Sequence, residues 1–414
     1  MKIASARSSF ITMFSGTLVA QIIAIAVLPL LTRLYTPEQI GVQNLFITTI
    51  NILMPLATLS YPMAIVLVKD KQDGINSTIL LSTVIVSILS FLLTLVFLDE
   101  IQMAFTYWSI CLSLSVSICM LLYGIQQINE YTFLKLEEFK VISRIAIENS
   151  LYLNVLKVAM GLLGGGYLGL IVSTVIAMLI KILRQSYYLK KKFIRVQYTK
   201  DIAEVKKVAR EYQSFPKYRC PQSLINTLSI SIPVYYIAIY YDADLVGYYT
   251  LALTLLTLPV NLIGNNVTSV LYPILVRYKK SKNALVLLRK YCLSLMFVGF
   301  FITFVIYTFG DVAIVYFFGK EWSMVYTFAL LLSIQSIFQL SNRPIVSAIT
   351  AFDYQKDMLI FEMGSFFIKF VALLVLINLL ELEDVIRIYS ILGATLYLIF
   401  SIYVYYMIKR EVED

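Results

Sequence analysis

The chain has 414 residues, of which 59% are hydrophobic and only 14% are charged, and its mean hydropathy is +0.81. This composition excludes an ordinary soluble protein of that length and predicts an all-α integral membrane protein. The net charge of +9 comes from 34 Lys and Arg residues against 25 Asp and Glu. Most of these basic residues flank apolar segments on one predicted side of the membrane. The positive-inside rule therefore explains the basicity, and we expect no nucleic-acid partner.

Twelve apolar segments, each long enough to cross a bilayer, follow one another along the chain. They lie near residues 10–32, 42–68, 75–98, 103–127, 145–164, 167–189, 221–241, 246–276, 291–309, 325–349, 358–380 and 386–408. The first carries Gln21 and Pro29 and is too long for a cleavable signal peptide. An even number of spans puts both termini on one side, and the basic residues predict that this side is cytoplasmic.

The spans divide into an amino-terminal six-helix bundle over 1–189, a basic cytoplasmic linker over 190–213 and a carboxy-terminal six-helix bundle over 214–414. Within the linker, an amphipathic helix is predicted with one apolar face made of Ile202, Val205, Ala209 and Tyr212. We expect this face to rest on the anionic inner leaflet, the membrane-lipid contact of the chain. An ordinary solvated linker is the alternative.

The two halves repeat one pattern. The segment Tyr35–Gly41 aligns with Tyr241–Gly247 at an offset of 206 residues, close to half of the chain. Each segment opens a span with polar residues at three- and four-residue spacing, which places them on one helix face. The residues expected to line a polar pathway in these and other spans are Gln21, Asn44, Thr48, Asn51, Asn154, Thr254, Thr257, Asn261, Asn265, Gln335, Gln339 and Asn342. The alternative is helix–helix packing, in which Asn and Thr form hydrogen bonds between helices.

Prolines also recur at matching positions. Pro29 and Pro233 lie in the first and seventh spans, and Pro55 and Pro259 lie in the second and eighth. Proline removes a backbone hydrogen bond and can bend a spanning helix. These four residues are therefore candidate hinges for a conformational change.

Three cations, Lys157, Arg343 and Lys369, lie within predicted spans. An unpaired charge there costs at least roughly 2.5–3.5 kcal/mol, so these residues need a partner or a function. The functional interpretation is a water-filled, cationic lumen that binds an anionic headgroup such as a diphosphate. The alternative is that they pair with local carboxylates or reach towards a membrane surface, and Glu362 shares a helix face with Lys369.

Several kinds of site are missing from the sequence. It has no histidine, no Gly-rich phosphate loop with lysine, and four cysteines (Cys111, Cys119, Cys220 and Cys292) without metal-type spacing. We expect no metal, no disulfide, no cofactor and no catalytic residue. A coupling ion, H⁺ or Na⁺, would have to use carboxylates, for which Glu362 and Glu148 are the candidates.

One set of motifs resembles a known family. It comprises Gly16–Gln21, Pro29–Gly41, Ala57–Tyr61, Ala64–Leu67 and Lys69–Asp70, followed in the second half by Phe215–Tyr218, Pro221, Leu224–Asn226, Pro233, Val246–Tyr249, Leu258–Pro259 and Tyr272–Pro273. These resemble the Wzx-type polysaccharide flippases of the multidrug/oligosaccharidyl-lipid/polysaccharide exporter superfamily. The resemblance covers residues 1–280 and is moderately specific.

The resemblance implies a V-shaped pair of six-helix bundles, alternating access across the bacterial inner membrane, and a cationic lumen lined by the first, second, seventh and eighth helices. It implies as substrate an undecaprenyl-diphosphate-linked oligosaccharide for O-antigen, capsule or exopolysaccharide assembly, with polymerase and chain-length machinery as expected partners. It carries over no fixed set of charged lumen residues, because these differ among family members.

Two other classes remain open. A small-molecule or ion antiporter of the same fold should prefer acidic lumen residues, whereas the charges within these spans are mainly cationic. A membrane polymerase or glycosyltransferase should present catalytic groups on a large outer loop. The largest outer segment expected here, Gly310–Ser323, offers little room. The leading prediction is therefore a transporter and not an enzyme.

Overall fold

The computed structural model is almost entirely helical and describes residues 2–68, 72–97, 109–279, 281–376 and 379–413. The side chains of residues 2–14, 265, 269 and 413 are outside this description. The motif residues Lys69 and Asp70 and the start of the predicted 103–127 span also lie outside it. The prediction of an all-α membrane fold is confirmed.

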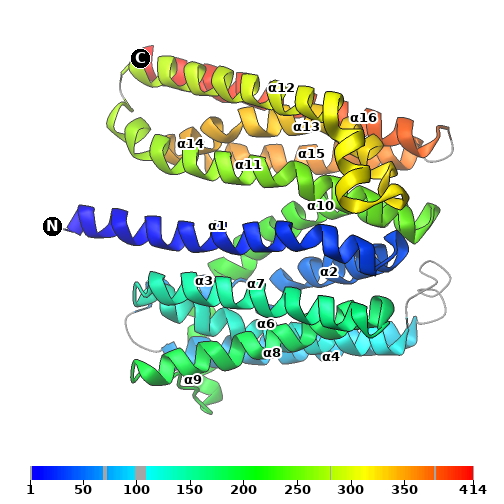
Figure 1. The fold of residues 1–414 in the computed structure, drawn as a ribbon. Helices are drawn as coiled ribbons and strands as arrows, with labels where there is room; N and C mark the ends of the chain where they lie inside the picture. The colour runs from blue at the N-terminus through cyan, green and yellow to red at the C-terminus, as the bar shows by residue number, and fades with distance from the viewer. Residues whose placement is uncertain (1, 69–71, 98–108, 280, 377–378, 414) are drawn as a thin grey trace. The chain divides into compact units, whose positions relative to one another are not determined.

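The described residues form two compact units, which we treat separately: Met1–Thr227 with Ala238–Asp244, and Leu228–Ile237 with Leu245–Asp414 (Figure 1). The first unit contains α1 (Lys2–Leu34), α2 (Pro37–Thr58), α3 (Pro62–Leu67), α4 (Gln72–Val96), α6 (Ile110–Lys135), α7 (Phe139–Leu162), α8 (Gly166–Lys191), α9 (Ile202–Glu211) and a π-helical turn (Phe215–Arg219). Helix α10 (Cys220–Tyr240) contributes residues to both units.

The second unit contains the other helices. They are α11 (Ala243–Arg277), α12 (Asn283–Phe318), a 3-10 turn (Lys320–Trp322), α13 (Met324–Ser341), α14 (Arg343–Phe352), α15 (Gln355–Leu376) and α16 (Leu382–Glu413). Its core is built where α11, α12, α14 and α16 meet, around Leu271, Leu288, Ile345 and Val404. The aligned spans α2 and α11 begin 206 residues apart, as the duplicated pattern predicts.

Eleven helices or helix pairs in the described part are long and apolar enough to cross a membrane. The predicted span 145–164 corresponds to α7, which is a helix of 24 residues but is not among the eleven. Its sequence explains this difference, because Lys140, Arg144, Glu148 and Lys157 all lie on it. Since α7 packs along α1, its polar residues are shielded by another helix.

The start of α2 follows from its sequence. The Thr36 side chain accepts a hydrogen bond from the Gln39 backbone, the Gln39 side chain accepts one from the Thr36 backbone, and Pro37 occupies the first turn. This reciprocal capping satisfies two amides that a helix start leaves without partners. Likewise Gly164 and Gly166, with positive φ angles, turn the chain between α7 and α8 as their spacing predicts.

The second predicted span is interrupted, so its continuity was wrongly predicted, whereas the tenth is divided into two helices but remains one apolar segment long enough to cross a membrane, Lys320–Phe352. The second span breaks between α2 and α3, where Leu59 and Ser60 both adopt the left-handed conformation, which is strained for residues with a side chain. The tenth span breaks at Asn342, two residues before Pro344, which has no N–H to donate in the first turn of α14. The four predicted hinge prolines all lie inside helices: Pro29 in α1, Pro55 in α2, Pro233 in α10 and Pro259 in α11.

The segment Gly310–Ser323, expected on the outer side, is largely helical, because α12 continues to Phe318. Apolar residues such as Val312, Ile314 and Val315 sustain the helix past Gly310. The non-helical stretch after α12 is therefore even shorter than expected, which leaves less room for a catalytic site on this loop.

The amphipathic helix of the linker exists as α9, and Ala209 and Tyr212 of its predicted apolar face pack against the protein, while the expected contact of this face with lipid stays a prediction. Val208 is 0% exposed and lies among Tyr61, Ile75 and Ile79, while Ile202 is 69% exposed. The Tyr61 hydroxyl donates to the Ala209 carbonyl at 3.0 Å. This helix, at the lower edge of Figure 1, packs on α4. The segment 190–213 thus belongs to the first unit.

Replacing Val208 by Asp should release this segment, because a carboxylate buried without a partner costs several kcal/mol. We expect trypsin to cleave within residues 190–213 of the purified protein at least roughly tenfold faster, since cleavage follows the population of the open form. Ile202→Asp, which adds the same charge at an exposed position of the same helix, is the matched control. Equal acceleration by both variants, or by neither, would contradict the docked arrangement of α9.

Candidate functional site

Arg343 is the first residue of α14 and is half-buried in the second unit. Its Nη2 donates to the Asn261 Oδ1 of α11 at 2.9 Å, while its Nε is buried without a hydrogen-bond partner among the described residues. A guanidinium has five N–H donors in a planar fork. An amide oxygen therefore accepts one hydrogen bond from this guanidinium, and the Nε donor remains without a hydrogen-bond partner among the described residues.

The Arg343 side chain also lies directly on α11. A β-carbon built at Gly264 would be 2.7 Å from Arg343 Cγ, 2.8 Å from Nε and 2.9 Å from Cδ. Such distances are shorter than van der Waals contact, so only glycine at this position leaves room for the arginine. Gly264 was not among the residues predicted from the sequence.

Lys369 on α15 is 6% exposed, and its ammonium lies over two aromatic rings of α16. The Nζ atom is 5.3 Å from the centroid of Tyr389 and 5.7 Å from that of Tyr397. A cation over a ring face is attracted by the negative potential of the π system. Aromatic rings thus form these contacts of the Lys369 ammonium.

Tyr397 connects the two cations. Its ring lies under Lys369, and Arg343 of α14 and Glu362 of α15 are near enough for their charges to act on its phenol. Three charged side chains that are distant in sequence therefore lie in the neighbourhood of one tyrosine of α16. We call this group the Tyr397 cluster, and it consists of Asn261, Arg343, Glu362, Lys369, Tyr389 and Tyr397. Two of the three predicted lumen cations lie in it.

The predicted amides of α13 and its end have different surroundings. Asn342 is buried and its Nδ2 donates to the Ser401 Oγ at 2.8 Å, which is a helix-packing contact. Gln335 lies against Gly393 of α16, and its Oε1 is buried with no hydrogen-bond partner among the described residues. Gln339 is half-buried. Asn342 thus has a structural role, whereas Gln335 keeps an unsatisfied acceptor.

The polar residues along one face of α11 also have different surroundings. Thr254 is exposed, and its hydroxyl donates to the Thr250 carbonyl of its own helix at 2.7 Å. Thr257 donates to the Thr254 carbonyl in turn. Asn261 binds Arg343, and the side chain of Asn265 lies outside the described residues. Threonines that bond within their own helix need no partner on another helix, so their methyl and hydroxyl surface stays available.

In the first unit, the predicted lining residues are accessible to different degrees. Asn51 of α2 is exposed, while Gln21 of α1 and Asn44 and Thr48 of α2 are half-buried. Thr58, in the same stripe, is buried and donates to the Met54 carbonyl. The stripe therefore becomes less accessible toward the break between α2 and α3.

Lys157 belongs to the first unit, so it is not part of the Tyr397 cluster. Its stripe on α7 contacts α1, because Ser150 donates to the Ala20 carbonyl at 2.7 Å and the Tyr35 hydroxyl donates to the Lys157 carbonyl at 2.6 Å. Asn154 is buried and donates to the Ser150 carbonyl. These contacts fix α7 against α1, and the Lys157 side chain itself is half-buried.

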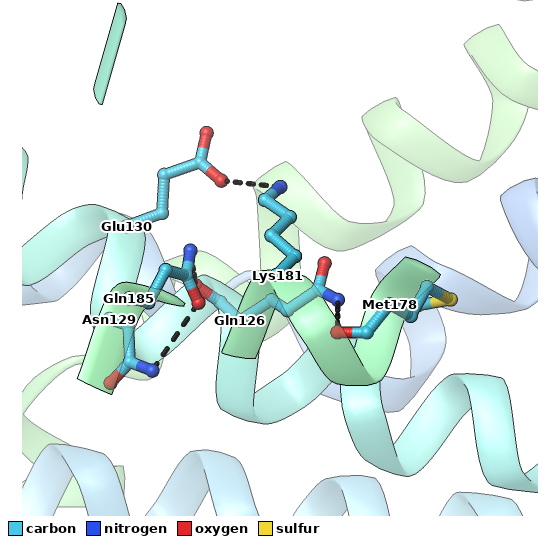
Figure 2. Close-up of polar contacts among 6 residues, drawn as sticks. All are labelled: Gln126, Asn129, Glu130, Met178, Lys181 and Gln185. Atoms are coloured by element: carbon cyan, nitrogen blue, oxygen red, sulfur yellow. Dashed lines mark hydrogen bonds and ion pairs between the residues drawn. The ribbon is translucent and has the colours of Figure 1, made fainter. Parts of the chain in front are cut away.

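Sequence reasoning missed a polar group between α6 and α8, which Figure 2 shows. Lys181 Nζ lies 3.2 Å from Glu130 Oε2, Asn129 Nδ2 donates to Gln185 Oε1 at 3.3 Å, and Gln126 Nε2 donates to the Met178 carbonyl at 2.9 Å. A usable signal was present, because Gln126, Asn129 and Glu130 recur at helical spacing on one face of α6.

The candidate coupling acid Glu148 has a defined partner. Arg184 Nε and Nη2 each donate to one of its carboxylate oxygens at 2.8 Å, and the Tyr188 hydroxyl donates to the same carboxylate at 3.0 Å. This two-bond geometry is the strongest that an arginine forms with a carboxylate. Glu148 therefore holds α7 and α8 together.

The chain was compared with protein families and solved structures. A family model described as polysaccharide biosynthesis protein matches residues 30–327. No curated protein matches the chain significantly.

Three solved structures indicate the fold. The chain is similar to the lipid II flippase MurJ in an inward closed conformation, with a TM-score of 0.73 and 14% identity over 97% of this chain and 87% of the other. It is also similar to an inward-facing multidrug resistance MATE family transporter of the MOP superfamily, with a TM-score of 0.68 and 13% identity over 97% and 96%. A MOP superfamily transporter from Pyrococcus furiosus gives a TM-score of 0.52 and 14% identity over 98% and 95%.

At these identities the structural neighbours show the fold alone, which is that of MOP-superfamily transporters. The family model covers well over half of the chain, and its description agrees with the resemblance found in the motifs. This chain is a multi-pass membrane protein and belongs to the family of polysaccharide biosynthesis proteins.

Proposed function

We propose that this protein is a flippase that moves an undecaprenyl-diphosphate-linked oligosaccharide across the bacterial inner membrane by alternating access. The polar headgroup would pass through the protein while the polyprenyl tail stays in lipid, so no covalent chemistry is needed. The protein would serve O-antigen, capsule or exopolysaccharide assembly and work beside a polymerase and chain-length machinery. Both termini would be cytoplasmic.

The observation that carries this proposal is that two cations of the predicted spans, Arg343 and Lys369, lie in the same unit and have uncharged groups as partners. Arg343 hydrogen-bonds to an amide, not to a carboxylate, and Lys369 is held by aromatic rings. Neither of these partners carries a negative charge, so neither contact cancels the positive charge of its cation. A diphosphate would satisfy the remaining donors, because its oxygens match the planar fork of arginine and the point charge of lysine.

The hydroxyl and amide groups of α2 and α11 support the sugar part of the proposal. Asn51 and Thr254 are exposed on these helices and carry no charge. Neutral donors and acceptors can bind sugar hydroxyls without strong selectivity.

An antiporter of the same fold is the second candidate, favoured by Glu362 at the Tyr397 cluster. The two functions are compatible if H⁺ or Na⁺ exchange drives the flipping, with Glu362 as the coupling residue. Glu148 is the weaker coupling candidate because Arg184 occupies both of its oxygens.

The experiment is surface-polysaccharide display in a host that lacks its own flippase and carries this protein with its glycosyltransferases. Arg343→Ala should lower display by about ten- to a hundredfold, the loss expected for hydrogen bonds to a charged group, and Arg343→Lys should retain part of it. Lys369→Ala and Lys157→Ala test the other two cations. Lys192→Ala, at an exposed ion pair with Glu138, is the control that should behave as wild type.

Protein abundance in the membrane is measured for every variant, so that loss of folding is separated from loss of transport. Wild-type display by all three cation variants at normal abundance would overturn the cationic site. A host in which the wild-type protein restores no display, although the lipid-linked substrate accumulates, would overturn the flippase assignment itself.

A further inference from the structure

Arg343, in the Tyr397 cluster, is held in place at two points. The sequence motifs revealed neither of these two points. Its backbone is fixed at the start of α14, between the buried residues Asn342 and Pro344. Its tip is fixed on α11, another helix of the same unit, through Asn261. Because both ends of the Arg343 side chain are held, its remaining N–H donors can point in only one direction.

The space for this arrangement comes from Gly264. The atoms that a β-carbon would strike are Cγ, Cδ and Nε, in the middle of the Arg343 side chain and not at its flexible end. Rotation of the tip alone therefore cannot relieve the clash. Any side chain at position 264 must push the whole arginine off the surface of α11, which also removes its guanidinium from Asn261.

The uncharged amide of Asn261 is a second feature of this arrangement, because it orients Arg343 without neutralising it. Asn261 lies three residues before Gly264, so both face the same side of α11. Its amide oxygen orients the guanidinium but carries no charge. An aspartate of the same shape would form an ion pair with Arg343 and cancel the charge that an anion needs. Asparagine is therefore the residue type that positions an arginine and leaves it cationic.

The unsatisfied Nε is the third observation. A buried donor without a partner costs about 1–3 kcal/mol, so it persists only where the surroundings hold it or a ligand relieves it. Nε belongs to the same side chain that Gly264 and Asn261 fix in place. The arginine is thus held in an incompletely bonded state, which favours an exchange of partners when an oxyanion arrives.

We propose that Asn261 and Gly264 are positioning residues that hold Arg343 as an oxyanion-binding cradle for the diphosphate of the substrate. This inference rests on the proposed function, which requires an anion site, but assigns roles that the function alone does not require. Asn261 is a ligand of the arginine, not a lumen residue that binds sugar, and Gly264 acts only through the space that it leaves.

The test is the binding of inorganic diphosphate to the purified full-length protein, measured by titration calorimetry at low and high salt. Asn261→Asp should weaken binding about tenfold or more without lowering thermal stability, because it neutralises Arg343 while keeping the contact. Gly264→Ala should weaken binding as much as Arg343→Ala does. In an Arg343→Ala background, Gly264→Ala should have no further effect on binding, since the side chain that it displaces is gone.

The outcomes separate the inference from the function. If Arg343→Ala loses diphosphate binding while both Asn261→Asp and Gly264→Ala keep it, the cradle is overturned and the anion site remains. If Arg343→Ala binds diphosphate as the wild type does, the anion site of the proposed function is overturned as well. Asn261→Asp keeps the test valid should Gly264→Ala fail to fold, because it replaces only the amide nitrogen by an oxygen and leaves the side-chain volume nearly unchanged.

The same titration with phosphatidylglycerol in detergent distinguishes the source of the phosphate. Weaker binding of phosphatidylglycerol than of diphosphate, with the same dependence on Asn261, supports the substrate headgroup as occupant. Tighter binding of phosphatidylglycerol would overturn that assignment and identify the cradle as a site for membrane phospholipid.

Discussion

Replacing Gly124 by Ala should destabilise the first unit by about 1–3 kcal/mol, the usual cost of forcing extra volume into a packed interior. Gly124 lies on α6 where this helix meets α4. A β-carbon there would be 2.5 Å from the Thr83 Oγ1, 2.8 Å from its Cγ2 and 3.0 Å from its Cβ. Thr83 is fully buried and its hydroxyl is bonded to the Ile79 carbonyl, so it cannot rotate away cheaply.

The measurement is the temperature at which half of the detergent-solubilised protein stays monodisperse. Thr83→Ala in the Gly124→Ala background removes the two closest atoms and should recover most of the lost stability, although Thr83→Ala alone is destabilising. Gly364→Ala is the control, because a β-carbon at Gly364 meets no atom within 4 Å. If the Gly124 variant melts like the Gly364 variant, α4 and α6 are not in close contact at this point.

Replacing Glu148 by Gln is expected to lower stability by about 1.5–3 kcal/mol while leaving transport per folded molecule near the wild-type level. The loss follows from the geometry, because Arg184 donates two hydrogen bonds to the carboxylate and Tyr188 donates a third. The amide can accept only part of this set and leaves Arg184 without a counter-charge.

Glu138→Gln provides the matched comparison, since the same change is made in an ion pair with Lys192 at an exposed site, where a pair is worth about 0–1 kcal/mol. The two variants should therefore differ clearly in melting temperature. Transport is measured by polysaccharide display divided by protein abundance. A Glu148→Gln protein that melts as the wild type does but no longer transports would show that Glu148 is an ion-coupling residue and not a structural one.

The cations within the spans have different surroundings in the two units, and this difference bears on the proposed transport mechanism. In the second unit, residues of α11, α14, α15 and α16 place Arg343 and Lys369 around one tyrosine. In the first unit, Lys157 lies on a helix whose polar residues bond to α1. The duplicated sequence pattern therefore does not give a duplicated site. The headgroup-binding residues that we propose are concentrated in one repeat.

Much of the fold could be predicted because it depends on local pattern. Apolar runs of membrane-spanning length predict helices, and the Thr36–Gln39 capping pair and the glycines at 164–166 mark where helices begin and end. The break at Leu59–Ser60 could not be read in this way, whereas Pro344 is a local signal for the break at Asn342. The segment Leu59–Ser60 contains no glycine, and Leu59 packs against a cluster whose members include residues far away in sequence, such as Val208.

By itself, the sequence determined the membrane class, the two repeats and the family. It also identified the cations that need an explanation, because the cost of a charge in a bilayer depends on the residue type and its depth. The tertiary structure decided which partner each cation has. Glu148 accepts hydrogen bonds from Arg184, and Asn342 donates one to Ser401 of α16. Arg343 lies over Gly264 and donates a hydrogen bond to Asn261. These pairings join residues 36 to 82 positions apart. Helical periodicity assigns a face to each residue but not the neighbour that the face will meet.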